Sequence, residues 1–477
     1  MTDLTVDSSA REMAAAVLAR RISARELLDL HLARIAERNP QLNAIVSLDE
    51  ERARAAASAA DEATARGEAL GPLHGLPFAF KDTHDVAGWR TTYGSPLFAE
   101  HVPETDDLVV ERIRAAGAVT IGKTNVPEFA AGSHTFNTVF GTTLNPIDPA
   151  RSAGGSSGGA ACAVRAGMVP LADGSDMGGS LRNPASFCNV VGLRPSPGRV
   201  PTWPSAAPWS TLSVQGPMAR TVADAALLLS VQAGPDARSP IAIEQPGAPF
   251  AAELGRELTG LRVAWSPDLG GAVSVDAAVA DRIAPQVAVF EQLGCTVAQD
   301  CPDFAGADDV FRMLRAWLFD LSLGGHRDRW PELLKESIVW NVDEGRKLTG
   351  ADLARAERLH AALFHRVREF FTRYDLLLLP VSQVVPFDAA LEYPTTVGGQ
   401  EQQTYLDWMR SAYFVTATGC PALSVPAGFT ADGLPVGLQV VGPHHGDLAV
   451  LQAGHAFEQA TRHQLQRPPV VRPSTLR

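Results

Sequence analysis

The stretch from Ser152 to Pro195 constrains the fold of this chain more than any other part of it. Its first segment, 152–160, reads Ser-Ala-Gly-Gly-Ser-Ser-Gly-Gly-Ala, and an Ala/Val-rich run follows. Its second segment, 173–185, reads Asp-Gly-Ser-Asp-Met-Gly-Gly-Ser-Leu-Arg-Asn-Pro-Ala. Glycines allow tight turns and the close approach of two backbones. The stretch therefore predicts two tight turns that each present a glycine-flanked serine, Ser156 in the first and Ser180 in the second.

The run at 152–160 has two other interpretations. One is a flexible Gly/Ser linker, but the helix-like apolar run from Ala160 to Val169 has no polar tail and argues against it. The other is a phosphate-binding loop, which ends in Gly-Lys-Ser/Thr. That ending is absent from 154–159, so a pair of catalytic serines is the favoured interpretation.

A second segment, 75–83, supplies a basic group for such serines. It reads Gly-Leu-Pro-Phe-Ala-Phe-Lys-Asp-Thr, and its apolar run predicts a buried strand that carries Lys81 into the interior. Burial lowers the pKa of a lysine, and a neutral lysine can take a proton from a serine. A surface lysine at a strand end is the alternative. Lys123 lacks the apolar approach of Lys81 and is not the predicted base.

In order and spacing, Lys81, Ser156 and Ser180 resemble the amidase signature family, whose members hydrolyse amides with a Ser-Ser-Lys triad. The resemblance implies that Ser180 is the nucleophile and that Ser156 passes its proton to Lys81. It also implies a cis peptide bond between Gly155 and Ser156. The resemblance spans 8–230 and 350–462 and is strongest at 72–85, 118–128 and 152–220.

Further residues are expected around the triad. By the resemblance, the backbone N–H groups that hold the oxyanion lie at Met177, Gly178, Gly179 and Ser180. Asp176 and Arg182 flank Ser180 with opposite charges and are expected to be buried supports, and Ser157 and Asn125 are expected to add hydrogen bonds. The expected substrate pocket contains Phe129, Ala131, Gly132 and Ser133 by the resemblance, and Trp203 and Trp209 because their proline-rich segment predicts a loop that reaches the pocket mouth. His84 is interpreted as the end of a strand rather than as a residue that lines the active site.

Strand-like and helix-like segments alternate along the chain, which predicts an α/β fold with a mixed, twisted central sheet covered by helices on both faces. Residues 1–70 are predicted to form an N-terminal helical segment, in which Asn39-Pro40 ends the second helix. Residues 71–465 are predicted to form one catalytic domain. Within it, 303–350 is a variable segment that shapes either the acyl pocket or an oligomer face. A loose tail is predicted for 466–477.

Composition limits the partners of the chain. Its 477 residues carry a formal net charge of −12, so no general attraction to nucleic acid or to anionic membranes is expected. No stretch is long and apolar enough to span a membrane. The five cysteines lack metal or redox spacing, and neither a metal nor another cofactor is expected. Reduced cysteines and the lack of a signal-like N-terminus predict a cytoplasmic protein.

The function expected from the resemblance is hydrolysis of a small-molecule amide, with esters and carbamates as further substrates, by a chain that forms a homodimer. An alternative is the glutaminase subunit of a tRNA-dependent amidotransferase, which uses the same triad. The aromatic residues of 303–350, together with Trp203 and Trp209, favour a substrate bulkier than glutamine. A third alternative, an inactive binding protein, is disfavoured because the three triad residues are all present.

Overall fold

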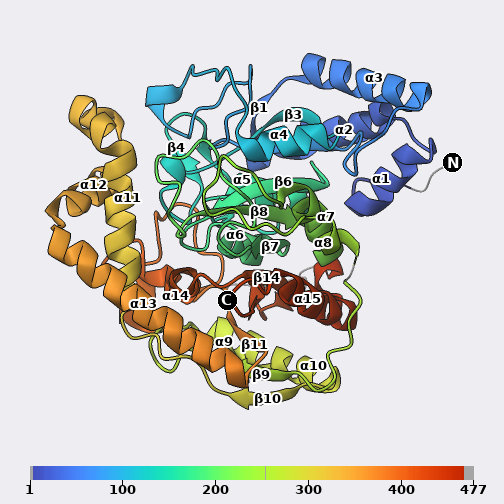
Figure 1. The fold of residues 1–477 in the computed structure, drawn as a ribbon. Coiled ribbons are helices and arrows are strands. Elements are labelled where there is room, and N and C mark those ends of the chain that lie inside the picture. The colour runs from blue at the N-terminus through green and yellow to red at the C-terminus, as the bar shows by residue number, and fades with distance from the viewer. Residues whose placement is uncertain (1–3, 253, 467–477) are drawn as a thin grey trace, which may run out of the picture.

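An eleven-stranded sheet forms the centre of the molecule in the computed structural model, which describes residues 4–252 and 254–466 (Figure 1). The order across the sheet is β1 (Ile45–Leu48), β3 (Val119–Thr124), β2 (Pro77–Lys81), β6 (Leu171–Asp176), β8 (Val214–Ala219), β7 (Val191–Arg194), β14 (Ala422–Phe429), β15 (Pro435–Val441), β11 (Leu376–Pro380), β9 (Arg262–Trp265) and β10 (Thr296–Gln299). Neighbours are parallel from β3 to β6 and from β11 to β10, and the central pairs are antiparallel. The predicted mixed sheet is confirmed.

Helices cover both faces of this sheet. One face carries α1 (Ala10–Leu18), α4 (Leu108–Ala115), α7 (Val222–Gln232), α8 (Pro249–Ala252), α9 (Ala277–Ile283), α10 (Val287–Gln292) and α15 (Asp447–Thr461). The other carries α2 (Ala24–Leu42), α3 (Glu50–Arg66), α5 (Gly158–Arg165), α6 (Arg182–Cys188), α11 (Ala307–Arg329), α13 (Gly350–Arg373) and α14 (Arg410–Thr418). α12 (Glu336–Lys347) packs on α11. No helix in the described residues is both long and apolar enough to cross a membrane.

Side chains that point alternately to the two faces of the sheet contribute to two separate hydrophobic cores, one on each face. In β2, Phe78 and Phe80 pack into the core of the first face, whereas Ala79 between them packs into the core of the second. Successive side chains of a strand point to opposite faces, so Lys81, two residues after Ala79, leaves the sheet on the side of α5. The pattern of the sequence thus determines which face receives the lysine.

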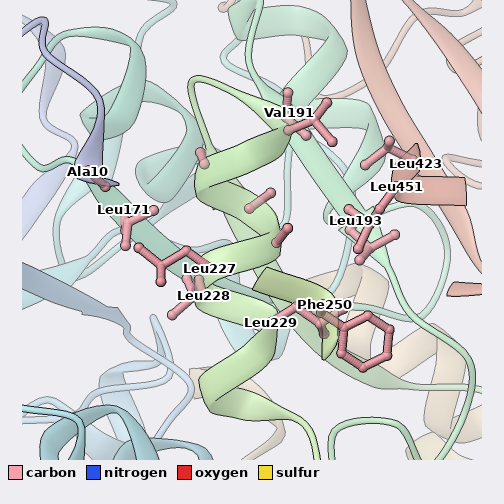
Figure 2. Close-up of a cluster of buried hydrophobic side chains, with 14 of the residues drawn as sticks. Ala10, Leu171, Val191, Leu193, Leu227, Leu228, Leu229, Phe250, Leu423 and Leu451 are labelled. Carbon is pink, nitrogen blue, oxygen red and sulfur yellow. The ribbon is translucent and has the colours of Figure 1, made fainter. Parts of the chain in front are cut away.

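The core of the first face is built around α7, a helix that is apolar on nearly all sides. Figure 2 shows its Leu227, Leu228 and Leu229 packed among side chains of other elements. Those neighbours are Ala10 of α1, Leu171 of β6, Val191 and Leu193 of β7, Phe250 of α8, Leu423 of β14 and Leu451 of α15. Since these elements come from both ends of the chain, the core ties the N-terminal helices to the C-terminal ones.

The second helix differs from the prediction at its end. Ser23 and Glu26 form a capping box at the start of α2. The prediction that Asn39-Pro40 ends this helix is wrong, because α2 continues to Leu42 and ends at Asn43 in a left-handed conformation. The side chain of Asn39 accepts the N–H groups of Ala44 and Ile45, which secures the chain beyond the proline. The tail predicted for 466–477 lies outside the described residues, except for its first residue.

The variable segment 303–350 is mainly helical. Figure 1 shows α11 and α12 side by side, with α13 crossing the end of α11, at one side of the molecule. The helix α11 also contacts α14. One side of α11 faces the loops that carry Ser156 and Ser180. Two short hairpins complete the described chain: β4 (Phe136–Asn137) with β5 (Gly141–Thr142), and β12 (Thr396–Val397) with β13 (Gln400–Glu401).

Candidate active site

Lys81, the last residue of β2, is completely buried and surrounded by hydroxyl groups. Its Nζ lies 2.8 Å from Ser156 Oγ, 2.9 Å from Ser157 Oγ and 2.9 Å from Ser175 Oγ. Burial lowers the pKa of Lys81 to about 7, while the negative charges of Asp173 and Asp176 act in the opposite direction. Near neutral pH the lysine is therefore balanced between its charged and neutral forms.

The loop that carries Ser156 is fixed by hydrogen bonds to its backbone. The peptide bond between Gly155 and Ser156 is cis, as the resemblance implied. The carbonyl of Gly155 accepts from Ser133 Oγ at 2.6 Å, and that of Gly154 accepts from Thr135 Oγ1 at 2.8 Å. Both serine and threonine come from the segment after β3, so this segment holds the loop in place.

The start of α5 lies close against the end of β3. A Cβ on Gly159 would lie 2.3 Å from the backbone nitrogen of Asn125, so only glycine fits. The carbonyl of Asn125 accepts the N–H of Gly159 at 3.2 Å, and its side chain donates to Thr143 Oγ1 at 3.0 Å. Asn125 thus joins the strand end to the helix that follows Ser156 and Ser157.

Ser180 lies on the turn between β6 and α6. The N–H of Ser157 donates to the carbonyl of Ser180 at 3.2 Å, which links the two serine loops directly. Gly179 has a φ of +109°, and a Cβ there would lie 2.7 Å from the side chains of Ala412 and Asn183. The turn therefore requires glycine both for its conformation and for its contact with α14.

The carboxylate of Asp176 holds the backbone of this turn in place. Its carboxylate accepts the N–H groups of Gly179 at 2.9 Å and Leu181 at 3.1 Å. It also pairs with Arg182 at 2.9 Å and Arg194 at 3.3 Å, and all three charged side chains are buried. Burial alone would raise the pKa of Asp176, but the two guanidinium groups hold it well below its usual range. Asp176 is therefore ionised at neutral pH.

Arg182 connects the turn to the C-terminal half of the chain. Its guanidinium donates to the carbonyl of Ala412 at 2.8 Å, to Thr416 Oγ1 at 2.9 Å and to Gln439 Oε1 at 2.6 Å. These partners lie on α14 and β15. The position of Ser180 thus depends on elements more than two hundred residues away in the sequence.

Three of the four backbone N–H groups expected at the oxyanion site are available. The N–H of Gly179 is already bonded to Asp176. Those of Met177, Gly178 and Ser180 have no acceptor within the described part of the chain. The hydroxyl of Ser180 likewise has no hydrogen-bond partner among residues 4–252 and 254–466. Unpaired donors beside a hydroxyl that lines a cavity can bind an oxygen that develops negative charge.

Ser175, Asp173 and His84 belong to this site, although sequence reasoning assigned them no role in it. Ser175 is the third hydroxyl around Lys81. Asp173 accepts the backbone N–H of Lys81 at 2.9 Å through Oδ1, and its Oδ2 is bonded to His84 Nδ1. The sequence signal was the Asp-Gly-Ser that precedes Asp176 in β6, where Asp173 and Ser175 alternate along the strand and so point to the same face. His84 was interpreted as the end of a strand, but its side chain lines a cleft next to the serine loops.

Two adjoining cavities open over the serines. The inner chamber, of about 130 Å³, is lined by Phe129, Ala130, Gly132, Ser156, Ser175, Met177, Gly178, Ser180, Ser213, Phe311, Arg315, Phe319, Leu406 and Met409. The outer cleft, of about 380 Å³, shares Phe129, Ser175, Met177 and Phe319 with the chamber. It extends over 198–215 and over Leu318 and Leu323 of α11. The two together are large enough for a small organic molecule.

The structure brings only some of the expected pocket residues to these cavities. Phe129 and Gly132 line the inner chamber. Ala131 is buried in the small core beneath α11 and α12, and Ser133 holds the Ser156 loop. Trp203 and Trp209 are not among the residues that line either cavity. Trp203 packs against Arg238, and Trp209 is 73% exposed.

The described residues contain no group of three or more His, Cys, Asp or Glu side chains that could hold a metal ion. The donor groups around the serines are hydroxyl groups, the Lys81 amine, backbone N–H groups and, across the chamber, the guanidinium of Arg315. Such a set is suited to moving a proton and stabilising an oxyanion.

Comparison with known proteins places this arrangement in a family. The amidase family model matches residues 26–451. An acylamidase of Rhodococcus erythropolis is 37% identical over 457 residues, with 94% of each chain covered. One of the subunits of the glutamyl-tRNA(Gln) amidotransferase of Ralstonia nicotianae is 37% identical over 506 residues, covering 97% of this chain and 99% of the relative.

A solved structure agrees with the sequence comparisons. A bacterial aryl acylamidase of the amidase signature enzymes superposes with a TM-score of 0.89 at 30% identity, covering 97% of this chain and 99% of that one. Similarity therefore extends over nearly the whole length in both sequence and fold. The chain belongs to the amidase signature family.

Proposed function

We propose that this chain hydrolyses a carboxylic amide through an acyl-enzyme on Ser180, with Ser156 as proton relay and Lys81 as base. The observation that carries the proposal is the buried Lys81 Nζ at 2.8 Å from Ser156 Oγ, together with the inner chamber that Ser156 and Ser180 both line. A lysine with a pKa of about 7 is neutral in part of the molecules at neutral pH and can accept a proton.

The first half of the cycle forms the acyl-enzyme. An ammonium group donates three hydrogen bonds, and Lys81 has three hydroxyl neighbours. When Lys81 is neutral, one of these contacts reverses, so that Ser156 can donate to Nζ and accept the proton of Ser180. Ser180 Oγ then attacks the carbonyl carbon of the amide. The carbonyl oxygen, which gains negative charge, is held by the free N–H groups of Met177, Gly178 and Ser180.

The second half releases both products. The proton returns from Lys81 through Ser156 to the amide nitrogen, and the C–N bond breaks. Water then attacks the acyl carbon while Lys81 again accepts a proton through Ser156. That proton returns to Ser180 Oγ as the C–O bond to the acyl group breaks, and the carboxylic acid leaves. Esters and carbamates are compatible with the same steps, since they too carry a carbonyl with a leaving group.

A stand-alone amidase is favoured over an amidotransferase component by the size of the outer cleft. Its lining by Val200, Leu318 and Leu323 supports a substrate bulkier and less polar than glutamine. The acylamidase relative supports the same conclusion. The amidotransferase relative supports the second candidate, a glutaminase that acts with partner subunits.

The deciding test is hydrolysis by the purified chain alone of aryl anilides, aliphatic amides, carbamates, esters and glutamine. We expect anilide or carbamate cleavage that is lost in Ser180→Ala. Activity on glutamine only, or only after partner subunits are added, would transfer the proposal to the second candidate. Wild-type turnover by Ser180→Ala would refute both.

A further inference from the structure

Arg315 of α11 is a buried cation in the wall of the inner chamber. It is 5% exposed, and it lines the same small space as Ser156 and Ser180. Its guanidinium stacks on the ring of Phe319, with 4.1 Å between Cζ and the ring centre. A fixed positive charge therefore lies in the space that is proposed to hold the scissile amide.

The protein uses only part of the hydrogen-bonding capacity of this group. Arg315 Nη1 donates to Asn341 Oδ1, and Nη2 donates to the hydroxyl of Tyr405 at 2.5 Å. A guanidinium carries five N–H donors, and the other three have no acceptor among residues 4–252 and 254–466. Both partners are neutral side chains. The described chain places no carboxylate within ion-pair distance of Arg315.

Arg312, one turn earlier on the same helix, is the contrasting case. Its Nε lies 3.0 Å from Asp308 Oδ1, and its Nη2 pairs with Asp407. One arginine of α11 is thus neutralised by two carboxylates, whereas the arginine that faces the chamber has none. Burying an unpaired charge is costly unless a partner compensates it, so a ligand anion in the chamber would relieve that cost at Arg315.

We propose that Arg315 binds a carboxylate of the substrate, so that the preferred amides carry a carboxylate on the part that enters the inner chamber. The inference rests on the proposed function and specifies its substrate class. A planar guanidinium with free N–H donors binds a carboxylate through two parallel hydrogen bonds. The carboxylate belongs either to the acyl part or to the amine part of the amide, and the test separates these two cases.

The test uses two pairs of anilides that differ only in charge. Glutaric acid monoanilide carries its carboxylate on the acyl side, and 5-oxohexanoic anilide is its neutral counterpart. 3-Acetamidobenzoate carries it on the amine side, and 3-acetylacetanilide is its neutral counterpart. We expect kcat/KM to favour the charged member of one pair by about 10- to 100-fold, the range of one charge-assisted hydrogen-bonded contact.

Variants then assign the preference to Arg315. Arg315→Gln should reduce the charged-to-neutral ratio to about 1, and Arg315→Lys should retain only part of it, because lysine lacks the planar pair of donors. The matched control Arg312→Gln should leave the ratio as in the wild type. A wild-type enzyme without preference in either pair, or an Arg315→Gln enzyme that keeps it, would overturn the inference.

Two further readouts keep this result separate from the proposed function. Cleavage of the neutral anilides that depends on Ser180 but shows no charge preference would leave the proposed function in place and overturn the inference alone. Calorimetric binding of the charged anilides to Ser180→Ala, compared with Ser180→Ala/Arg315→Gln, needs no turnover. Equal affinities in these two proteins would overturn the inference, and a loss of about 10- to 100-fold would support it.

Discussion

The two sides of the inner chamber are built differently. The sheet wall, formed by the Ser156 loop and the Ser180 turn with Lys81 buried behind them, has its charges satisfied within the protein: Lys81 contacts three hydroxyls and Asp176 two guanidinium groups. The helical wall, formed by Phe311, Arg315 and Phe319 of α11, consists of two rings and a cation without a counter-ion among the described residues. Under the two proposals, the sheet wall is preorganised for the reaction, whereas the helical wall gains its missing counter-charge from the substrate.

The largest effect should come from Ser180→Ala, which removes one oxygen from the sheet wall. We expect kcat to fall about 10⁴- to 10⁶-fold, because no acyl-enzyme can form. Substrate affinity, measured by calorimetry, should remain within a few-fold of the wild type because the helical wall is intact. A fall in kcat of less than a hundredfold would show that chemistry does not depend on this turn.

Lys81→Met should lower kcat about 10³- to 10⁴-fold, as expected for loss of a general base. Lys123→Met is the matched control, because Lys123 is also fully buried, on the neighbouring strand, and donates to the carbonyl of His84 and to Thr91 Oγ1 rather than to a serine. Folded Lys123→Met should keep kcat within about tenfold. Equal losses in the two variants would mean that the hydroxyl contacts of Lys81 have no special role.

Asp176→Asn tests whether the sheet wall is held by its buried ion pairs. Removing the carboxylate leaves Arg182 and Arg194 without their shared counter-charge, and we expect the free energy of unfolding to fall by about 3–5 kcal/mol. Urea unfolding followed by circular dichroism measures this loss. The exposed pair of Asp29 and Arg54 provides the control, since Asp29→Asn should not shift the urea midpoint measurably. Similar midpoints for both variants would contradict the assignment.

The pH dependence of kcat/KM should report Lys81. Its pKa is lowered from 10.5 to about 7 in the folded protein, and only the neutral form accepts a proton. The rate should therefore rise about tenfold per pH unit below pH 7 and level off above it. The unfolded chain binds more protons between pH 7 and 10.5, so Lys81 also makes stability increase with pH over that interval. A rate independent of pH between about 5.5 and 8 would argue against a lysine base.

Phe319→Ala should have the smallest effect, and it should depend on the substrate. Phe319 lines both cavities and supports the guanidinium of Arg315. We expect KM for an aryl anilide to rise about tenfold, as for the loss of one aromatic contact, whereas acetamide hydrolysis should change much less. Steady-state kinetics on the two substrates measure the difference. A uniform fall in kcat on both would place Phe319 in the chemistry instead.

The sheet wall was largely predictable from the sequence because its signals are local. The glycines around Ser156 and Ser180 indicate tight turns, and the apolar residues before Lys81 indicate a buried strand. The mixed sheet follows from the alternation of strand-like and helix-like segments. Ser175 was missed, since a single serine in a strand gives no local sign that its hydroxyl reaches Lys81.

The helical wall could not be predicted in the same way. Arg315 resembles Arg312 in sequence, and only the packing of α11 decides that one meets two carboxylates and the other the chamber. Trp203 and Trp209 were expected in the pocket on residue type alone, yet neither lines a cavity over the serines. Side-chain direction in a proline-rich loop depends on contacts with distant segments, which periodicity does not report.

A covalent acyl intermediate on Ser180 is the step on which the proposed reaction depends, and mass spectrometry can detect it. The purified chain would be mixed with a slowly hydrolysed aryl carbamate, quenched in acid and digested. We expect a carbamoyl adduct on the peptide that contains Ser180, formed in step with release of the aryl product and absent from Ser180→Ala. An adduct on another residue, or turnover with no adduct on Ser180, would contradict the proposed reaction.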